Sequence, residues 1–229
     1  MILELLPCVE GLVAVNKPPG LLVIPGRAPA DATCLRDLLA SQLGRPVWVC
    51  HRIDRDTSGV VLFATSAERH REVSLAFEHG QVKKRYLAIV QGCVRGPLDI
   101  DLALVQARKQ KMRVALPGEE GKPSRTLVRP RELFARATAV ECEPLTGRQH
   151  QLRVHLRAKG HPLLLDHQYG RKEPWSERDL GGETDEPVLA RTPLHAEWLS
   201  LESLGLLVQA PLPQDMTRTL ELLRRQARP

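Results

Sequence analysis

Residues 47–64 read VWVCHRIDRDTSGVVLFA, which is an apolar segment, a polar segment and a second apolar segment. The two apolar segments, Val47–Cys50 and Val60–Ala64, have the length and residue types of buried strands. The polar segment His51–Gly59 holds five ionisable side chains in its first six positions, which is more than a plain turn requires. Because loops between buried strands often carry reactive groups, we predict a functional loop here.

Local chemistry leaves the roles inside this loop open. Asp54 has the chemistry of a nucleophile or a general base, and His51 that of a base or a ligand. Asp56 precedes Thr57 and Ser58, a context that suits a cap for the next turn. An ordinary charged loop is the alternative at this point.

The rest of the chain mixes strands and helices without a regular alternation, which predicts an α+β fold and one domain over residues 1–229. The other expected strands are Leu12–Val15, Leu21–Ile24, Gln81–Gln91, Arg125–Val128, Ala137–Cys142, Leu194–Leu201 and Leu206–Val208. We expect four helices. The first is capped by Thr33 and stopped by Gly44, and the second begins at the capping box Thr65–Glu68 and ends near Gly80. The other two are Arg148–Lys159 and Gln214–Arg225. Residues 170–192 are expected to form a loop.

The 229 residues carry 33 Lys and Arg against 27 Asp and Glu, a net charge of +6. Between Arg108 and Arg157 the excess is larger, because 12 basic residues face 5 acidic ones. Residues 172–186 are instead acidic, with six acids against two bases. A local basic excess suits a polyanionic partner, although a merely solvated face has the same composition.

Several classes of protein are excluded by what the sequence lacks. No apolar run approaches the roughly 18 residues that a membrane span needs, and the N-terminus has no basic start typical of a signal peptide. The five cysteines are scattered without Cys-x-x-Cys spacing, so we expect neither disulfides nor a structural metal. Glycine-rich nucleotide motifs are absent, and eight aromatic rings are too few for base stacking on a sheet. We therefore expect a soluble, cytoplasmic protein without a cofactor.

Two other features carry candidate chemistry. The segment Thr146–Leu156 places several arginines and histidines at helical spacing, but its histidines lack the spacing of a helical zinc pair. Arginine forks suit phosphates or a buried carboxylate, and a solvated arginine face is the alternative. Tyr86 follows three basic residues in an expected strand, where an ordinary core tyrosine is equally compatible.

Taken together, these segments resemble the RluA family of RNA pseudouridine synthases. The match covers about Val13 to Leu212, and its most specific blocks begin at His51 and Thr146. The other blocks, in the family's order, are Asn16–Leu21, Lys84–Ala88, Gly121–Pro123, Gly160–Pro162 and Leu194–Ala196. One departure is Leu165, where family members usually have glycine before the aspartate.

The resemblance implies isomerisation of uridine to pseudouridine within RNA, without a cofactor or a metal. It implies three catalytic residues: Asp54, as nucleophile or base, Arg153 as the partner that keeps Asp54 ionised, and Tyr86 against the flipped uracil. Arg52 would fill the space that the base vacates. Further expected substrate contacts are His51, Arg55, Thr57, Arg148, His150, Gln151, Lys109 and Lys111.

The resemblance also implies a mixed, mainly antiparallel sheet flanked by helices, with a central active-site cleft. Because few residues precede Asn16, we expect no separate N-terminal RNA-binding domain. The basic stretch Arg108–Arg136 is expected to bind a structured ribosomal or transfer RNA, and its first part, with Arg108, Lys109, Lys111 and Arg113, is expected to grip phosphates as a flexible loop. We expect a monomer. Two alternatives are a catalytically idle RNA-binding or ribosome-assembly factor of the same fold, and a glycosidic-bond hydrolase that would need a second acid paired with Asp54.

Overall fold

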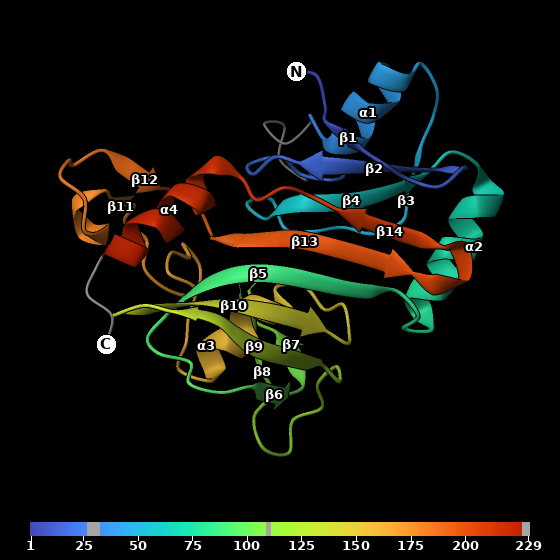
Figure 1. The fold of residues 1–229 in the computed structure, drawn as a ribbon. Helices are drawn as coiled ribbons and strands as arrows, with labels where there is room; N and C mark the ends of the chain where they lie inside the picture. Colours follow the sequence, from blue (N-terminus) through green and yellow to red (C-terminus); the bar gives the residue numbers. More distant parts are fainter. Residues whose placement is uncertain (27–32, 109–110, 226–229) are drawn as a thin grey trace. The chain divides into compact units, whose positions relative to one another are not determined.

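The computed structural model describes residues 1–26, 33–108 and 111–225 (Figure 1). The chain divides into two compact units. The first unit comprises Met1–Lys84 and His195–Pro211, and the second comprises Arg85–Leu194 and Leu212–Pro229. The single domain over residues 1–229 therefore stays a prediction.

The first unit is a mainly antiparallel sheet with two helices. Its strands are β1 (Leu5–Leu6), β2 (Leu12–Lys17), β3 (Trp48–Val49), β4 (Ser58–Ala64), β13 (Leu194–Leu201, from its second residue) and β14 (Leu206–Gln209). The strand order is β1, β2, β4, β13 and β14, and β3 pairs with the end of β4. β13 and β4 run parallel, whereas the other pairs of this unit are antiparallel.

Strand β4 is buried along its whole length because apolar residues cover both of its faces. Leu62 lies in a cluster with Val73 of helix α2 (Ala67–Glu78), whereas Phe63 packs in a second cluster with Leu35 of helix α1 (Leu35–Leu43). A continuous apolar run is what a strand covered on both sides requires, so the predicted strand at 60–64 is confirmed.

The helix boundaries of this unit bring two corrections. Thr33 does not cap α1, because the cap position is Cys34, whose thiol contacts Asp37 Oδ2 at 3.2 Å. Helix α2 does begin at the predicted capping box, although the cap is Ser66, whose hydroxyl accepts from the Arg69 amide. The predicted strand at 21–24 is wrong, since this segment makes one isolated bridge, from Leu22 to Cys34.

The second unit also has a mainly antiparallel sheet, in the order β5, β10, β9, β6. These strands are β5 (Lys83–Gln91, from its third residue), β6 (Leu98–Asp101), β9 (Arg125–Leu133) and β10 (Ala137–Pro144). The helices of the second unit are α3 (Gln151–Ala158) and α4 (Gln214–Arg225). Each helix covers one face: Leu156 of α3 packs with Ala88 and Val140, and Leu220 of α4 packs with Ile89 and Ala139.

Two segments that we predicted as loops contain hairpins. The first part of the basic stretch forms β8 (Met112–Val114), which pairs with β7 (Leu104–Gln106) just before the stretch. Buried Leu104 and Met112 anchor this hairpin. Residues 170–192 include β11 (Trp175–Ser176), the short helix η3 (Arg178–Leu180) and β12 (Pro187–Leu189), and Leu180 and Leu189 pack in the same cluster as α4. A second short helix, η4 (Glu202–Leu204), joins β13 to β14 in the first unit.

The predicted α+β class with a mixed, mainly antiparallel sheet is confirmed, and α4 has the predicted bounds. Helix α3 begins later than predicted, because His150 adopts a left-handed backbone with φ of 54° at its N-terminal end. Among the described residues, no helix has the length and apolar composition that crossing a bilayer requires.

Candidate active site

The predicted functional loop is a tight turn that leads directly into β4. The Thr57 amide donates to the Asp54 carbonyl at 3.2 Å, and the Thr57 side chain is buried. Arg52 and Arg55 are exposed on either side of the half-buried Asp54. In the chain, two exposed arginines therefore bracket Asp54, and Asp56 is half-buried as well. Thr57, which we predicted as a substrate contact, lies inside the fold.

A buried lysine fixes the shape of this loop. Lys17 ends β2 without measurable exposure, and its Nζ donates to the carbonyls of Pro18, Leu21 and Arg55, each at 2.8 Å. The Gly20 amide donates to the same Arg55 carbonyl at 2.9 Å. Because a charged group is costly to bury without hydrogen bonds, this ammonium holds the turn after β2 against the Asp54 loop. We did not predict this role for Lys17.

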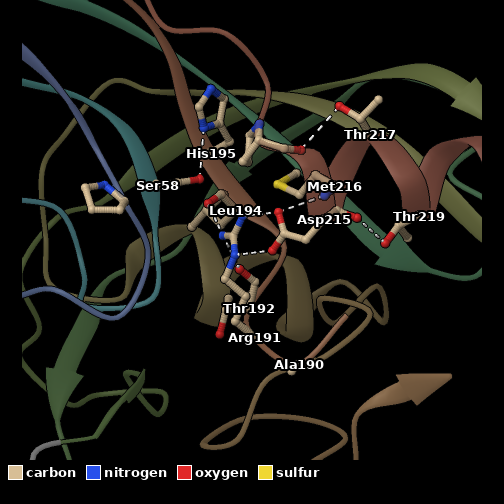
Figure 2. A network of polar contacts seen from close by, with 12 residues as sticks. Ser58, Ala190, Arg191, Thr192, Leu194, His195, Asp215, Met216, Thr217 and Thr219 are labelled. Carbon is tan, nitrogen blue, oxygen red and sulfur yellow. Dashed lines mark hydrogen bonds and ion pairs between the residues drawn. The ribbon is translucent and has the colours of Figure 1, made fainter. Parts of the chain in front are cut away.

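The other end of the loop is clamped by β13. The Ser58 hydroxyl lies 2.9 Å from His195 Nδ1, as Figure 2 shows, and His195 Nε2 lies 3.3 Å from the Ala210 carbonyl. A carbonyl accepts only, so Nε2 carries the proton and Nδ1 accepts from Ser58. Gly59 has φ of 108°, and a Cβ there would lie 2.2 Å from the Ala196 carbonyl oxygen. This close approach of two backbones demands glycine.

His51 has a structural place in the first unit. Its Nε2 accepts from the Leu62 amide at 3.0 Å, and its ring lies 5.0 Å from the ring of Phe77. Burial, together with the charge of Lys84, lowers the pKa of His51 to about 3. An uncharged imidazole whose Nε2 already accepts a backbone amide does not suit the predicted contact with an anionic substrate.

Tyr86 lies in β5 of the second unit, opposite Cys142 of β10. It is half-buried at the border of the cluster that contains Ala88 and Val90. Tyr86, Ala88 and Val90 thus share one face of the strand that we predicted at Gln81–Gln91. Its position at the edge of a packed face leaves one part of the ring accessible.

Arg153 forms a buried, two-pronged ion pair that we did not predict. Its Nε lies 2.8 Å from Asp166 Oδ2 and its Nη2 lies 2.7 Å from Asp166 Oδ1, with side-chain exposures of 9% and 1%. Burial by itself would raise the pKa of Asp166, but the Arg153 guanidinium and the amides of Gln168 and Tyr169 outweigh it and lower this pKa. Asp166 is therefore ionised, and the pair carries no net charge. The predicted ion pair of Arg153 with Asp54 stays a prediction.

A second buried arginine secures the start of β13. Arg191 Nε lies 2.6 Å from Asp215 Oδ2 and Nη2 lies 2.9 Å from Asp215 Oδ1 (Figure 2). Its Nη1 donates to the Thr192 and Leu194 carbonyls. Because Asp215 opens α4, this pair fixes the first turn of that helix to the chain that continues into His195.

The segment before α3 is built mainly by Gln151, which corrects another prediction. Its Oε1 accepts from the Thr146 hydroxyl and the Arg148 amide, and its Nε2 donates to Arg125 O and to Thr126 Oγ1. All four contacts are internal and the side chain is buried, so Gln151 positions this turn rather than binding RNA. Arg148 is exposed, with its Nε donating to the Pro123 carbonyl at 3.2 Å.

Several basic side chains of the basic stretch already have partners within the protein. Arg113 is paired with Glu119 at 2.6 Å, and Arg125 with Asp99 at 2.6 Å. Lys111 Nζ donates to the Gln168 carbonyl at 3.0 Å. Lys109 lies outside the described residues. Local acids therefore pair with part of the positive charge of this stretch, and its predicted contact with RNA stays a prediction.

The predicted catalytic residues are distributed over both units: Asp54 belongs to the first, and Tyr86 and Arg153 belong to the second. Within the second unit, Arg153 and His150 both contact Tyr169, which follows Asp166 by three residues in the chain. In the described part of the chain, no group of three or more His, Cys, Asp or Glu side chains is arranged to hold a metal ion.

Comparison with known proteins places these features in one family. Residues 11–158 match the family model described as RNA pseudouridylate synthase. The chain is 35% identical over 223 residues to ribosomal large subunit pseudouridine synthase D of Nitrosomonas europaea, covering 94% of this chain and 63% of that protein. It is 34% identical to the dual-specificity RNA pseudouridine synthase RluA of Pasteurella multocida, covering 85% of this chain and 89% of that protein. The chain thus spans less than two thirds of the first of these relatives.

Solved structures agree with the sequence relatives. Human RNA pseudouridylate synthase domain containing 4 superposes with a TM-score of 0.76 at 27% identity, over 94% of this chain and 91% of the human one. Human RNA pseudouridylate synthase domain containing 1 gives a TM-score of 0.70 at 25% identity, over 100% and 97%. The family resemblance drawn from the sequence is confirmed: the chain belongs to the RluA family of RNA pseudouridine synthases.

Proposed function

We propose that this chain is an isomerase that converts uridine to pseudouridine within RNA, with Asp54, Tyr86 and Arg153 as its catalytic residues. In this reaction the C1′–N1 bond of the uridine breaks, the uracil turns and C1′ joins its C5, while C5 loses its proton and N1 gains one. Atoms and electrons balance without a redox partner. The relatives are named for ribosomal RNA and for dual specificity, which supports ribosomal or transfer RNA as the substrate.

The way in which the structure holds Asp54 is the observation that carries this proposal. Lys17 and Gly20 bind the Arg55 carbonyl directly after Asp54, and Ser58, at the end of the loop, is bound to His195. The backbone that follows Asp54 is therefore held at two points, which limits the freedom of the carboxylate to reorient. Such preorganisation serves a nucleophile or a base that must meet one atom of a sugar or a base.

Exposed Arg52 fits the proposed role in base flipping. Removing a uridine from its stack costs a few kcal/mol, and a side chain that enters the vacated space offsets part of this cost. Arg52 is exposed beside Asp54 and is therefore accessible to an RNA strand. Tyr86, with its partly accessible ring, would stack against the displaced uracil.

The ion pair with Asp166 changes what Arg153 contributes. Since the Asp166 carboxylate neutralises the guanidinium, Arg153 serves as an oriented hydrogen-bond donor more than as a source of positive charge. An oriented donor is suited to hold a carboxylate or a uracil oxygen in place. The role of Asp54 as nucleophile or as base stays open between these two chemistries.

The decisive experiment compares Asp54→Asn with Asp101→Asn, which removes an exposed carboxylate of β6. Single-turnover pseudouridine formation is expected to fall at least about 100-fold in Asp54→Asn and to stay unchanged in Asp101→Asn. RNA affinity should be similar in all three proteins. Pseudouridine formation by Asp54→Asn at the wild-type rate would refute the assignment.

The same assay separates the alternative of a catalytically idle RNA-binding or assembly factor. Such a factor would bind RNA but leave its uridines unchanged, whereas release of free uracil would indicate a hydrolase. Mapping pseudouridines in RNA from cells with and without the protein identifies the target. A monomeric state, a cytoplasmic location and independence from cofactors are further parts of this proposal.

A further inference from the structure

Tyr169 joins two elements of the second unit through its hydroxyl. The Met112 amide of β8 donates to the hydroxyl at 2.7 Å, and His150 Nδ1, at the start of α3, lies 2.7 Å from the same oxygen. An amide can only donate, so the hydroxyl oxygen accepts from Met112 and its proton is available for His150. The side chain is buried, with 7% exposure. This one oxygen therefore connects the β7–β8 hairpin to the helix that carries Arg153.

The ring of Tyr169 also supports Arg153 directly. The guanidinium carbon lies 4.9 Å from the ring centroid, within the range of a cation–π contact. The Tyr169 amide donates to Asp166 Oδ1, the oxygen that Arg153 Nη2 binds. Tyr169 thus holds both members of the ion pair, one through its ring and one through its backbone.

The β7–β8 hairpin makes a second contact with the same segment. Lys111 Nζ donates to the Gln168 carbonyl, and Gln168 Oε1 accepts from Arg153 Nη2 at 3.2 Å. Arg108, on the same connection between the strands, is exposed. Two cations on a hairpin suit the phosphates of an RNA backbone, whose negative charge recruits lysine and arginine. A movement of this hairpin would act on residues 166–169, the segment that holds Arg153.

We propose that Tyr169 is a positioning residue that links the β7–β8 hairpin to Arg153, so that RNA bound by the hairpin raises the rate of isomerisation as well as the affinity. This inference rests on the proposed function. It separates two tasks of the hairpin: its cations bind phosphates, and Tyr169 relays its placement to Arg153.

The test is a double-mutant cycle of Tyr169→Phe and Lys111→Gln, measured as the single-turnover rate at saturating RNA. Tyr169→Phe keeps the ring and removes the hydroxyl, and we expect an about tenfold slower rate, equivalent to one lost hydrogen bond. Lys111→Gln is expected to slow the rate about threefold in the wild-type background and to leave it unchanged in the Tyr169→Phe background, since the relay is already cut. Lys159→Gln, an exposed lysine at the end of α3, is the matched control and should not alter the rate.

RNA affinity tests the phosphate contact of Lys111 separately from the reaction rate. In a plot of the logarithm of the RNA-binding constant against the logarithm of the salt concentration, the slope should become less steep by about 0.7 for Lys111→Gln. We expect this in both backgrounds, because the phosphate contact is lost in each. If Tyr169→Phe does not fold, His150→Asn removes one of the two hydroxyl contacts, the one that joins Tyr169 to the start of α3, while tolerating the left-handed backbone.

Independent rate effects of the two substitutions, or a wild-type rate in Tyr169→Phe, would overturn the relay. Failure of the proposed function looks different. The wild-type chain would then bind RNA without forming pseudouridine, and the relay would have no reaction to act on.

Discussion

Replacing Arg153 with methionine is expected to destabilise the second unit strongly, because it removes the counter-charge of a buried carboxylate. Asp166 is 1% exposed and would keep two hydrogen bonds, from the amides of Gln168 and Tyr169, while losing both guanidinium contacts. Breaking a buried pair by removing one partner costs about 3–5 kcal/mol, so we expect the free energy of unfolding to fall by that amount. Methionine retains most of the apolar stem, so little of the loss comes from packing.

The loss of stability in Arg153→Met is also expected to depend on pH. In the wild type the folded-state pKa of Asp166 is lowered, so the pair contributes stability above the unfolded pKa of about 4 and loses it as the pH falls through the folded value. Without Arg153, burial raises the folded-state pKa instead. The carboxylate then destabilises the variant at neutral pH, and protonation relieves this as the pH falls. The difference between wild type and Arg153→Met should therefore shrink from about pH 7 to about pH 4.

The loss of stability and its dependence on pH are both measured by urea denaturation of four proteins: the wild type, Arg153→Met, Asp166→Asn and the double variant. The asparagine keeps an acceptor for the two amides, and the double variant should be less destabilised than the sum of the single ones, by about 2 kcal/mol. Additive losses, or a destabilisation by Arg153→Met that does not change with pH, would show that Arg153 is not the group that stabilises the Asp166 carboxylate.

Three further predictions concern the first unit. Lys17→Met should cost about 3 kcal/mol or more in urea denaturation and slow single turnover, because three carbonyls lose their shared donor; wild-type stability would contradict the role of this ammonium. Gly59→Ala should prevent stable folding, as measured by thermal denaturation. Gly118→Ala, also at positive φ but with open space around it, is the control and should lower the free energy of unfolding by about 1 kcal/mol. Equal effects would argue against the close approach of the Gly59 backbone to the Ala196 carbonyl. The free energy of unfolding of the wild type should fall as the pH decreases from about 6.5 to the folded pKa of about 3, since the His51 imidazole takes up a proton on unfolding. In His51→Gln this fall should be smaller. An acid denaturation curve that is the same in both proteins would refute the lowered pKa.

The features that the sequence predicted well depend on local pattern. The strand at 60–64 followed from an unbroken apolar run, and α4 followed from helical spacing within twelve residues. The family resemblance came from ordered short blocks, which are also local. These signals survive without knowledge of the fold because each depends on residues that are neighbours in the chain.

The predictions that failed concern segments whose structure depends on distant partners. The segment after Leu21 was predicted as a strand, but it makes a single bridge to Cys34, since short apolar runs do not reveal whether a partner strand is available. The β7–β8 hairpin was missed because its anchor, the Met112 amide on the Tyr169 hydroxyl, joins positions 57 residues apart. Gln151 was predicted as an RNA contact, and the sequence did not reveal its internal acceptors at Arg125 and Thr126, which lie 26 and 25 residues away.

The family, the α+β class and the candidate reactive groups could all be predicted from the amino-acid sequence, since these depend on which residues occur and in what order. Which of these groups become partners depends on the folded chain. It paired Arg153 with Asp166, placed Lys17 under the Asp54 loop and used His195 to bind Ser58. The physical reason is that a buried charge or polar group must find a partner wherever the folded chain supplies one, and such a partner can lie over a hundred residues away, as His195 does from Ser58.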